Sequence, residues 1–201
     1  MQNELSREYF LKEGLRGIPR MLTLSNTNRI SRNFGCFDRT YWQYRVVDFP
    51  AGVFQYCVLP LALAYNIRVS QNPFYQKESV RELIVGGMEF AKSSSHADGS
   101  CDDYYLNERA AGATAFSLYA LTESFLIMKL NDLRLVSFFK KRADWLVRNE
   151  EPYPLANHQA LIAIGLYNLF LITGEEQYRE KSSEQIRRVL KLQSEEGWFQ
   201  E

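Results

Sequence analysis

The chain has 201 residues, with 24 basic and 24 acidic side chains and a formal net charge of zero. Hydrophobic residues make up 46% of it and charged residues 24%, which are ordinary values for a globular protein and argue against a disordered chain. A balanced charge gives no whole-chain electrostatic reason to bind nucleic acid or an anionic membrane, so neither is expected as a partner.

Cysteine spacing, motifs and apolar stretches exclude several further classes of site. Cys36, Cys57 and Cys101 include no close pair, which argues against a disulfide framework and a CxxC zinc site. No GxxxxGKS/T, GxGxxG or GxSxG motif is present, so we predict no nucleotide site, no cofactor and no metal. The N-terminus lacks the apolar stretch of a signal peptide, and residues 161–173 are shorter than a membrane span of roughly 18–20 residues. We therefore expect a cytoplasmic protein.

Residues 1–50 form the first of two expected regions. Residues 5–15 can form a short helix, which nearby glycines and Pro19 are expected to end. Residues 25–48 show no sustained hydrophobic period, because aromatic side chains alternate with Asn, Arg, Ser and Gly. This composition predicts an ordered, aromatic-rich loop region that packs on the rest of the chain.

From residue 51 to residue 201, segments that are apolar on every face alternate with segments that carry one apolar stripe. The first kind is expected at residues 51–65, kinked at Pro60, and at residues 110–128 and 155–173. The second kind is expected at residues 77–92, 132–148 and 175–193. A helix that is apolar all round must be surrounded by protein, whereas a one-sided helix can cover it from outside. The pattern predicts inner helices packed together and shielded by outer helices.

The junctions after the one-sided helices also resemble one another. Acidic or glycine-containing turns stand at residues 97–100, 150–153 and 195–198, which points to a repeated helical hairpin. The expected fold is all-α, an incomplete α/α toroid of about three helical hairpins, with HEAT-type units of roughly 40–47 residues as an alternative. Because a fourth inner helix should start where the chain ends, we expect a fragment of a larger protein with a missing C-terminal domain. A complete three-hairpin domain is the alternative.

The densest group of chemically active side chains lies at residues 98–109, ahead of the second apolar helix. Four acids, two tyrosines and one arginine stand there, and paired carboxylates can serve as acid and base. The alternative is structural, since Asp and Asn favour turns and negative charge suits a helix N-terminus. Substrate contacts are predicted from Asp98, Asp102, Asp103, Glu108 and Arg109.

Asn157 and His158 form a second candidate, at the start of the third apolar helix. A histidine titrates near neutrality and can move a proton, and a neighbouring Asn amide can hold a carboxylate or a hydroxyl. The alternative is a histidine that packs or caps at a helix start. His96 stands in a serine-rich turn and is expected to be exposed, and two distant histidines without cysteine partners do not predict a zinc site.

The aromatic run between Phe34 and Phe49 is a third candidate. Flat rings beside Arg and Asp suit stacking on sugar rings, so Arg39 and Trp42 are predicted to contact substrate. The alternative is that these aromatic side chains attach the N-terminal segment to the helical body.

With these residues in hand, the chain resembles the α/α-toroid N-terminal domains of the heparinase II/III-like polysaccharide lyases. The resemblance rests on residues 35–42, on residues 98–109, and on Asn157-His158 followed by residues 195–199. It implies that a polysaccharide or oligosaccharide with acidic sugars is the substrate and that the reaction is a β-elimination. The other catalytic and metal residues of that family lie further along, in and before a β-sandwich domain that this chain does not contain.

The resemblance also implies roles for single residues. Asn157 would neutralise the uronate carboxylate, and His158 would act as a base or contact the substrate. Tyr104 or Tyr105 would supply the acid, and Trp198 is a further substrate-binding candidate. The alternative function is a non-catalytic helical-repeat scaffold that binds a protein or a glycan, because repeats build concave binding faces. A terpene-cyclase toroid is disfavoured, since no DDxxD or DxDD signature is present.

Overall fold

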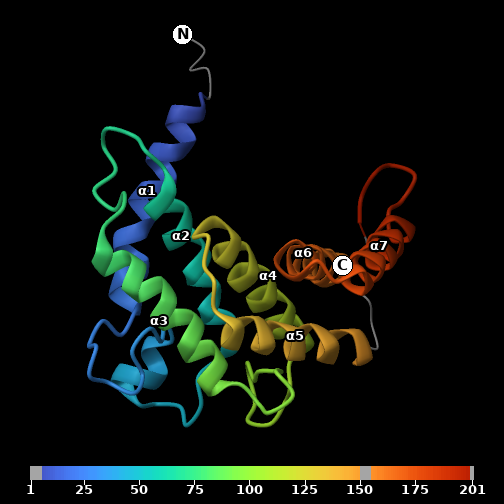
Figure 1. The fold of residues 1–201 in the computed structure, drawn as a ribbon, viewed down its shortest axis with the longest axis horizontal. Coiled ribbons are helices and arrows are strands. Elements are labelled where there is room, and N and C mark those ends of the chain that lie inside the picture. The colour runs from blue at the N-terminus through green and yellow to red at the C-terminus, as the bar shows by residue number, and fades with distance from the viewer. Residues whose placement is uncertain (1–5, 150–154, 200–201) are drawn as a thin grey trace.

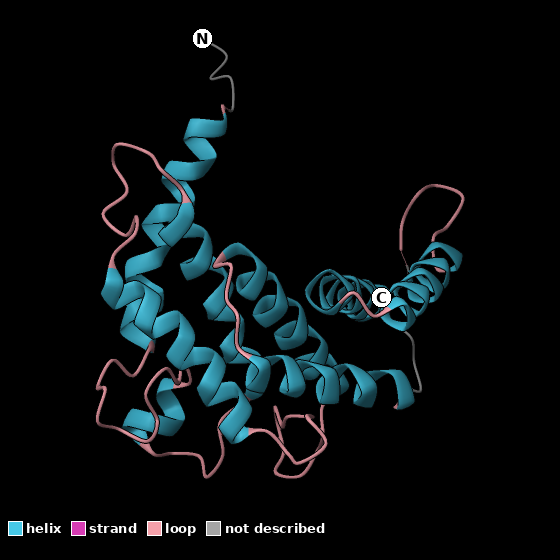
Figure 2. Ribbon diagram, in the orientation of Figure 1, coloured by secondary structure: helices cyan, strands magenta, loops and turns pink. Residues whose placement is uncertain are grey.

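The structure, a computed structural model, describes residues 6–149 and 155–199 of the chain. Within these ranges the fold is all-α, as predicted, with helices joined by loops and no β-strand (Figure 2). The helical elements are α1 (Arg7–Leu24), η1 (Thr40–Tyr44), η2 (Gly52–Cys57), α2 (Val58–Asn66), α3 (Glu78–Ser94), α4 (Ala111–Ile127), α5 (Leu133–Arg148), α6 (Ala156–Thr173) and α7 (Glu176–Lys191).

Five of the six helical segments predicted after residue 51 are confirmed as single α-helices, and two of their ends have clear local causes. Asp132 begins α5, because its carboxylate accepts the backbone N–H groups of Arg134 at 2.8 Å and Leu135 at 3.4 Å. Gly174 ends α6 in the left-handed conformation, with φ of 71°, which glycine adopts without a steric penalty.

The N-terminal helix is longer than predicted. It continues through Gly14, Gly17 and Pro19 to its end at Leu24, so the prediction that these residues stop it is wrong. Ile18, beside the proline, is buried in the core. Because most helix stability in a folded protein comes from packing of the apolar face, the helix continues across a proline that removes one hydrogen bond.

The interruption expected at Pro60 lies slightly before it. The chain first forms the 3₁₀ helix η2, and α2 then begins at Val58. Pro60 therefore stands in the first turn of α2, where its missing N–H removes no helical hydrogen bond. The segment predicted as one kinked helix is thus a 3₁₀ helix followed by an α-helix.

The helices that are apolar on every face lie next to one another. In the middle of the fold, α4 contacts η2, α2 and α6 (Figure 1). The one-sided helices pack against them, since α3 contacts α2, α5 contacts both α4 and α6, and α7 contacts α6. No helix in the described ranges combines the length and the apolar character needed to cross a membrane. Side chains fully removed from solvent in this core include Leu61, Ile84, Leu118, Phe139 and Leu166.

Candidate functional site

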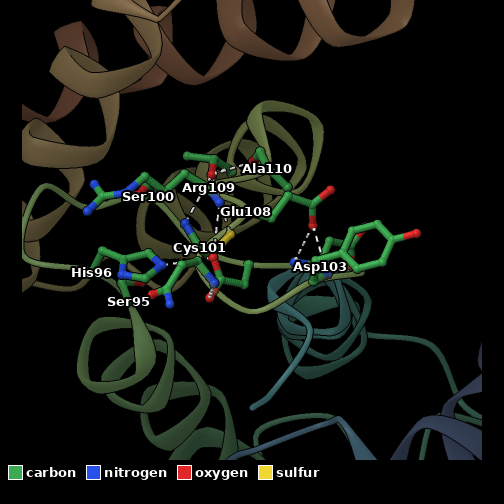
Figure 3. A network of polar contacts seen from close by, with 12 residues as sticks. Ser95, His96, Ser100, Cys101, Asp103, Glu108, Arg109 and Ala110 are labelled. Atoms are coloured by element: carbon green, nitrogen blue, oxygen red, sulfur yellow. Dashed lines mark hydrogen bonds and ion pairs between the residues drawn. The ribbon is translucent and has the colours of Figure 1, made fainter. Parts of the chain in front are cut away.

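The loop of residues 95–110, between α3 and α4, contains a network of polar contacts (Figure 3). The buried carboxylate of Asp102 organises this network. That carboxylate lies 2.8 Å from Nε2 of His96 and accepts the backbone N–H groups of Asn107 at 2.9 Å and Arg109 at 3.0 Å. Burial acts to raise the pKa of Asp102, but these hydrogen bonds outweigh it and hold the pKa below its ordinary value. The prediction that His96 is exposed is wrong, because its side chain is only 22% exposed and pairs with Asp102.

Asp98 closes the turn at the start of this loop. Its carboxylate accepts the backbone N–H of Ser100 at 3.0 Å and the Ser100 hydroxyl at 2.6 Å, and it pairs with the guanidinium of Arg109. Backbone bonds complete the turn, since the His96 N–H donates to the Ser100 carbonyl and the Gly99 N–H donates to the His96 carbonyl, both at 2.9 Å. The side chains of Asp98 and Asp102 therefore hold the backbone of their own loop.

Arg142 of α5 anchors the loop to the helical core. Its side chain is buried, and its Nε donates to the Gly99 carbonyl at 2.8 Å while Nη2 donates to the Ser95 hydroxyl at 2.6 Å. Nη1 donates to the Ser117 hydroxyl on α4, and the guanidinium lies 4.8 Å from the ring centroid of Phe138. Gly99 has φ of 91°, and a Cβ there would lie 2.5 Å from the Arg142 backbone nitrogen. This close approach requires glycine.

Glu108 shapes the tip of the loop. Its Oε2 accepts the backbone N–H groups of Asp103, Tyr104 and Tyr105 at 3.2, 2.8 and 3.2 Å. Burial raises the pKa of Asp103, and the nearby carboxylates of Glu108 and Asp38 raise it further. Tyr104 and Tyr105 are 79% and 73% exposed. A fixed backbone therefore presents two aromatic side chains to solvent.

The half-buried side chain of His158 lies at the start of α6, against the first turn of α4. Its ring centroid is 5.8 Å from that of Phe116, edge to face, and Phe116 is in turn 6.3 Å from Tyr56 of η2. A Cβ on Gly112 would lie 2.5 Å from Cε1 of His158, so the imidazole occupies the space that this glycine leaves open. The neighbouring Asn157 is exposed, and its Oδ1 accepts the His158 N–H at 2.6 Å. Side chains from η2, α4 and α6 thus meet at one corner.

Polar side chains continue from this corner along α4. Tyr119 follows Phe116 by one helical turn, and its pKa is raised by burial and, to a smaller degree, by Glu123 and Tyr56. The carboxylate of Glu123 accepts a hydrogen bond from Nδ2 of Asn168 on α6 at 2.8 Å. Together these residues form a strip of polar and aromatic groups where α4 faces α6.

The loop and the histidine lie at the same end of the apolar helices. The Gly52 N–H, at the start of η2, donates to the Asp102 carbonyl at 2.7 Å, and the Ala110 N–H, at the start of α4, donates to the Cys101 carbonyl at 2.8 Å. His158 stands at the start of α6. Two of the segments predicted as separate candidates, residues 98–109 and Asn157-His158, therefore lie at the N-terminal ends of η2, α4 and α6.

The aromatic candidates before residue 50 have mainly structural contacts. Trp42 donates its Nε1–H to the Leu24 carbonyl at 2.8 Å, which ties η1 to the end of α1. Arg39 donates to Oε1 of Gln43 at 2.7 Å and lies 5.1 Å from the ring centroid of Tyr44. These contacts favour the alternative in which this region is attached to the helical body.

Trp198 is the remaining candidate from the sequence. It is 73% exposed, in the turn that follows α7. Because α6 and α7 are paired and joined only by Gly174 and Glu175, they run in opposite directions. The end of α7 therefore lies on the same side as the start of α6, where Asn157 stands.

Three aromatic residues of the corner were missed from the sequence: Tyr56, Phe116 and Tyr119. A signal for two of them was present, because Gly112, Phe116 and Tyr119 stand at helical spacing on one face of a segment recognised only as apolar. Tyr56, in contrast, lies in residues 51–65, which the sequence predicts only as an apolar helix kinked at Pro60.

Across residues 6–149 and 155–199, no three metal-binding side chains lie close enough together to hold an ion. No family model matches the chain, and no curated protein and no solved structure matches it.

Proposed function

We propose that this chain is a carbohydrate-active protein that takes an acidic polysaccharide at the N-terminal ends of η2, α4 and α6 and cleaves it by β-elimination. We also propose a finer architecture for the chain, in which three helical hairpins form part of an α/α toroid with an inner and an outer layer. The successive contacts of α2, α4 and α6, each covered by a one-sided helix, support that architecture.

One observation carries the proposal: a histidine held edge to face against an aromatic ring, next to an exposed amide. The imidazole of His158 is positioned by Phe116 and by the space above Gly112, so its orientation is restricted. Asn157 presents its side chain at the same helix end. His158 and Asn157 thus place a base beside an amide that can bind a carboxylate. This arrangement suits a substrate in which the proton to be removed is on the carbon next to a carboxylate.

The proposed reaction needs three roles. The Asn157 amide donates to the uronate carboxylate, which stabilises the negative charge that develops there. His158 removes the proton from the adjacent ring carbon, whose electron pair forms the carbon–carbon double bond as the bond to the glycosidic oxygen breaks. A tyrosine hydroxyl then protonates the departing oxygen. Tyr56 is a candidate for this acid, because its ring packs on Phe116 in the same cluster as His158. Tyr104 and Tyr105 are the candidates from the sequence.

The loop of residues 95–110 has a binding role in this proposal. Tyr104 and Tyr105 offer exposed rings on which sugar faces can stack, and the Glu108 carboxylate holds their backbone in place. Asp98 and Asp102 are already paired with cationic or backbone donors, which reduces their repulsion of an acidic chain.

The test is incubation of the protein with a panel of uronic-acid polysaccharides, following the ultraviolet absorbance of an unsaturated product. We expect His158→Ala and Asn157→Ala each to lower the rate by at least about a hundredfold. Asn131→Ala, an exposed residue before α5, is the matched control and should leave the rate unchanged. Rates that stay at the wild-type level in both site variants would remove these residues from the mechanism.

A second candidate, a non-catalytic binding scaffold, is favoured by uncovered apolar side chains on the all-apolar helices. Leu63 of α2 and Ile164, Tyr167 and Leu171 of α6 are exposed, which is unusual for such helices. Calorimetric titration with the same polysaccharides separates the two functions. Saturable binding without any unsaturated product would support the scaffold and exclude the lyase.

A further inference from the structure

A groove of about 900 Å³ lies between the N-terminal half of α1 and the loop of residues 66–74 that follows α2. We call it the α1 groove. It lies at the far end of α2 from the proposed site, since α2 leaves η2 near Asp102 and ends at Asn66. In Figure 1 the start of α1 and this loop extend together beyond the other helices. A ligand in the α1 groove would leave the corner around His158 accessible.

The floor of the α1 groove is apolar and mainly aliphatic. Leu11 and Leu15 contribute from α1, and Ile67, Val69 and Phe74 contribute from the loop. All five side chains are half-buried, and Leu15 and Phe74 also pack against the core. Such a floor suits an apolar helix face better than a sugar, because sugar rings stack on aromatic faces and this floor offers only one.

The rim of the α1 groove is positively charged. Arg7, Lys12, Arg16 and Arg68 line it, with Glu8 as the only acid of the lining. Arg16 pairs with Glu13, outside the groove lining. Within the described ranges, no ion pair includes Arg7, Lys12 or Arg68. The rim therefore has cationic groups available to an acidic partner, in a chain whose overall charge is zero.

The other flank of α1 is uncovered as well. Tyr9 and Phe10 are 49% and 58% exposed, with their rings edge to face at 5.7 Å. From Arg7 to Pro19, the part of α1 that lines the groove has a length of about 18 Å at 1.5 Å per residue. That length matches about three turns of a second helix.

We propose that the α1 groove binds an acidic amphipathic helix of a partner protein. The apolar face of that helix would lie on Leu11, Ile67 and Val69, and its carboxylates would pair with Arg7, Lys12 and Arg68. This is the helix-in-groove mode of recognition, in which apolar anchors at helical spacing supply affinity and flanking charges supply specificity.

The test begins with selection from a phage-displayed library of random 14-residue peptides on the full 201-residue chain. We expect enriched peptides to carry Leu, Ile or Phe at helical spacing between Asp and Glu residues. Fluorescence anisotropy then measures the affinity of one labelled selected peptide, which should fall as salt concentration rises.

The variants decide whether binding occurs in the α1 groove. The triple variant Arg7→Glu, Lys12→Glu, Arg68→Glu should bind the peptide at least roughly tenfold more weakly. The triple variant Lys141→Glu, Arg187→Glu, Lys191→Glu makes the same charge change on exposed residues of α5 and α7 and should bind as wild type does. Circular dichroism verifies that both fold, and Arg68→Glu alone replaces the triple variant if that one unfolds.

Three outcomes would overturn the proposal. The first is selection of peptides without acidic residues, or of none. The second is equal binding by the groove variant. The third is that vesicles of phosphatidylcholine and phosphatidylserine, or a uronic-acid polysaccharide, bind the groove and displace the peptide, which would assign it to a membrane or a glycan. None of these results bears on the turnover assay of His158, so the two proposals fail separately.

Discussion

The loop of residues 95–110 and the corner around His158 are neighbours, yet their polar groups are used differently. In the loop, the carboxylates of Asp98, Asp102 and Glu108 accept hydrogen bonds from backbone N–H groups of the loop itself. At the corner, Asn157 is exposed and the half-buried His158 ring packs edge to face on an aromatic neighbour. The dense group of acids therefore stabilises the backbone of its own loop. The restrained, partly exposed imidazole of His158 is the better candidate for chemistry.

The largest expected effect concerns the anchor of the loop. Arg142→Met should lower the free energy of unfolding by about 3 kcal/mol, because it removes buried hydrogen bonds to Gly99 and Ser95 and leaves those oxygens without this donor. Urea unfolding followed by circular dichroism measures it. The matched control is Arg148→Met, exposed on the same helix, with a change within about 0.5 kcal/mol. A loss for Arg142→Met as small as the control's would show that the loop does not depend on this side chain.

The next effect tests the buried carboxylate. Asp102→Asn should cost about 2 kcal/mol at neutral pH, because an amide offers one acceptor oxygen where two oxygens now accept hydrogen bonds. The folded-state pKa of Asp102 is lowered, so the wild-type advantage is present above the ordinary value of 3.8 and is lost as the pH falls below it.

Unfolding curves of wild type and Asp102→Asn between neutral and strongly acidic pH measure this dependence. Asp48→Asn, an exposed carboxylate in the same half of the chain, is the control and should track wild type. If the difference between wild type and Asp102→Asn stays constant across the whole range, the hydrogen bonds of the loop do not lower the pKa of Asp102.

A smaller effect on stability, with a larger one on activity, is expected at the corner. Gly112→Ala places a methyl group where the His158 ring lies, so the imidazole must move. The higher helix propensity of alanine stabilises α4 by about 1 kcal/mol and offsets part of the cost of that movement. Under the proposed lyase function the turnover rate should fall by roughly tenfold or more. Gly14→Ala in α1, where the space is open, is the control for adding a methyl group to a helix. A turnover rate of Gly112→Ala equal to that of wild type would show that the position of the His158 ring does not affect the reaction.

The smallest effect on stability is expected at the tip of the loop. Because Tyr104 and Tyr105 are exposed, replacing both by Ala should change the free energy of unfolding by less than about 0.5 kcal/mol. Their loss should nevertheless weaken binding of an acidic oligosaccharide about three- to tenfold, measured by calorimetry. Tyr9→Ala, an exposed aromatic residue on α1, should leave that affinity unchanged. Undiminished affinity in the loop variant would remove the tip from the binding surface.

Much of the fold could be predicted because helix formation follows the local pattern of apolar residues. The stretches that became α4 and α6 are apolar on every face, and such segments form helices wherever neighbours can surround them. The errors arose where packing overrode local preference, as at Pro19 inside α1, or where a short 3₁₀ helix replaced the expected α-helix before Pro60. At the proposed site, the sequence singles out Asn157 and His158 as candidates, whereas Phe116 and Tyr56 emerge only from the contacts between the rings.

By itself, the sequence determined the alternation of wholly apolar and one-sided helices and the helix ends at Asp132 and Gly174, because these depend on residues a few positions apart. Only the tertiary structure decided which side chains meet. Arg142 reaches Gly99 across 43 positions, and the ring of His158 fills the space above Gly112. Contacts of this kind depend on how whole helices pack, and packing joins residues that no local pattern connects.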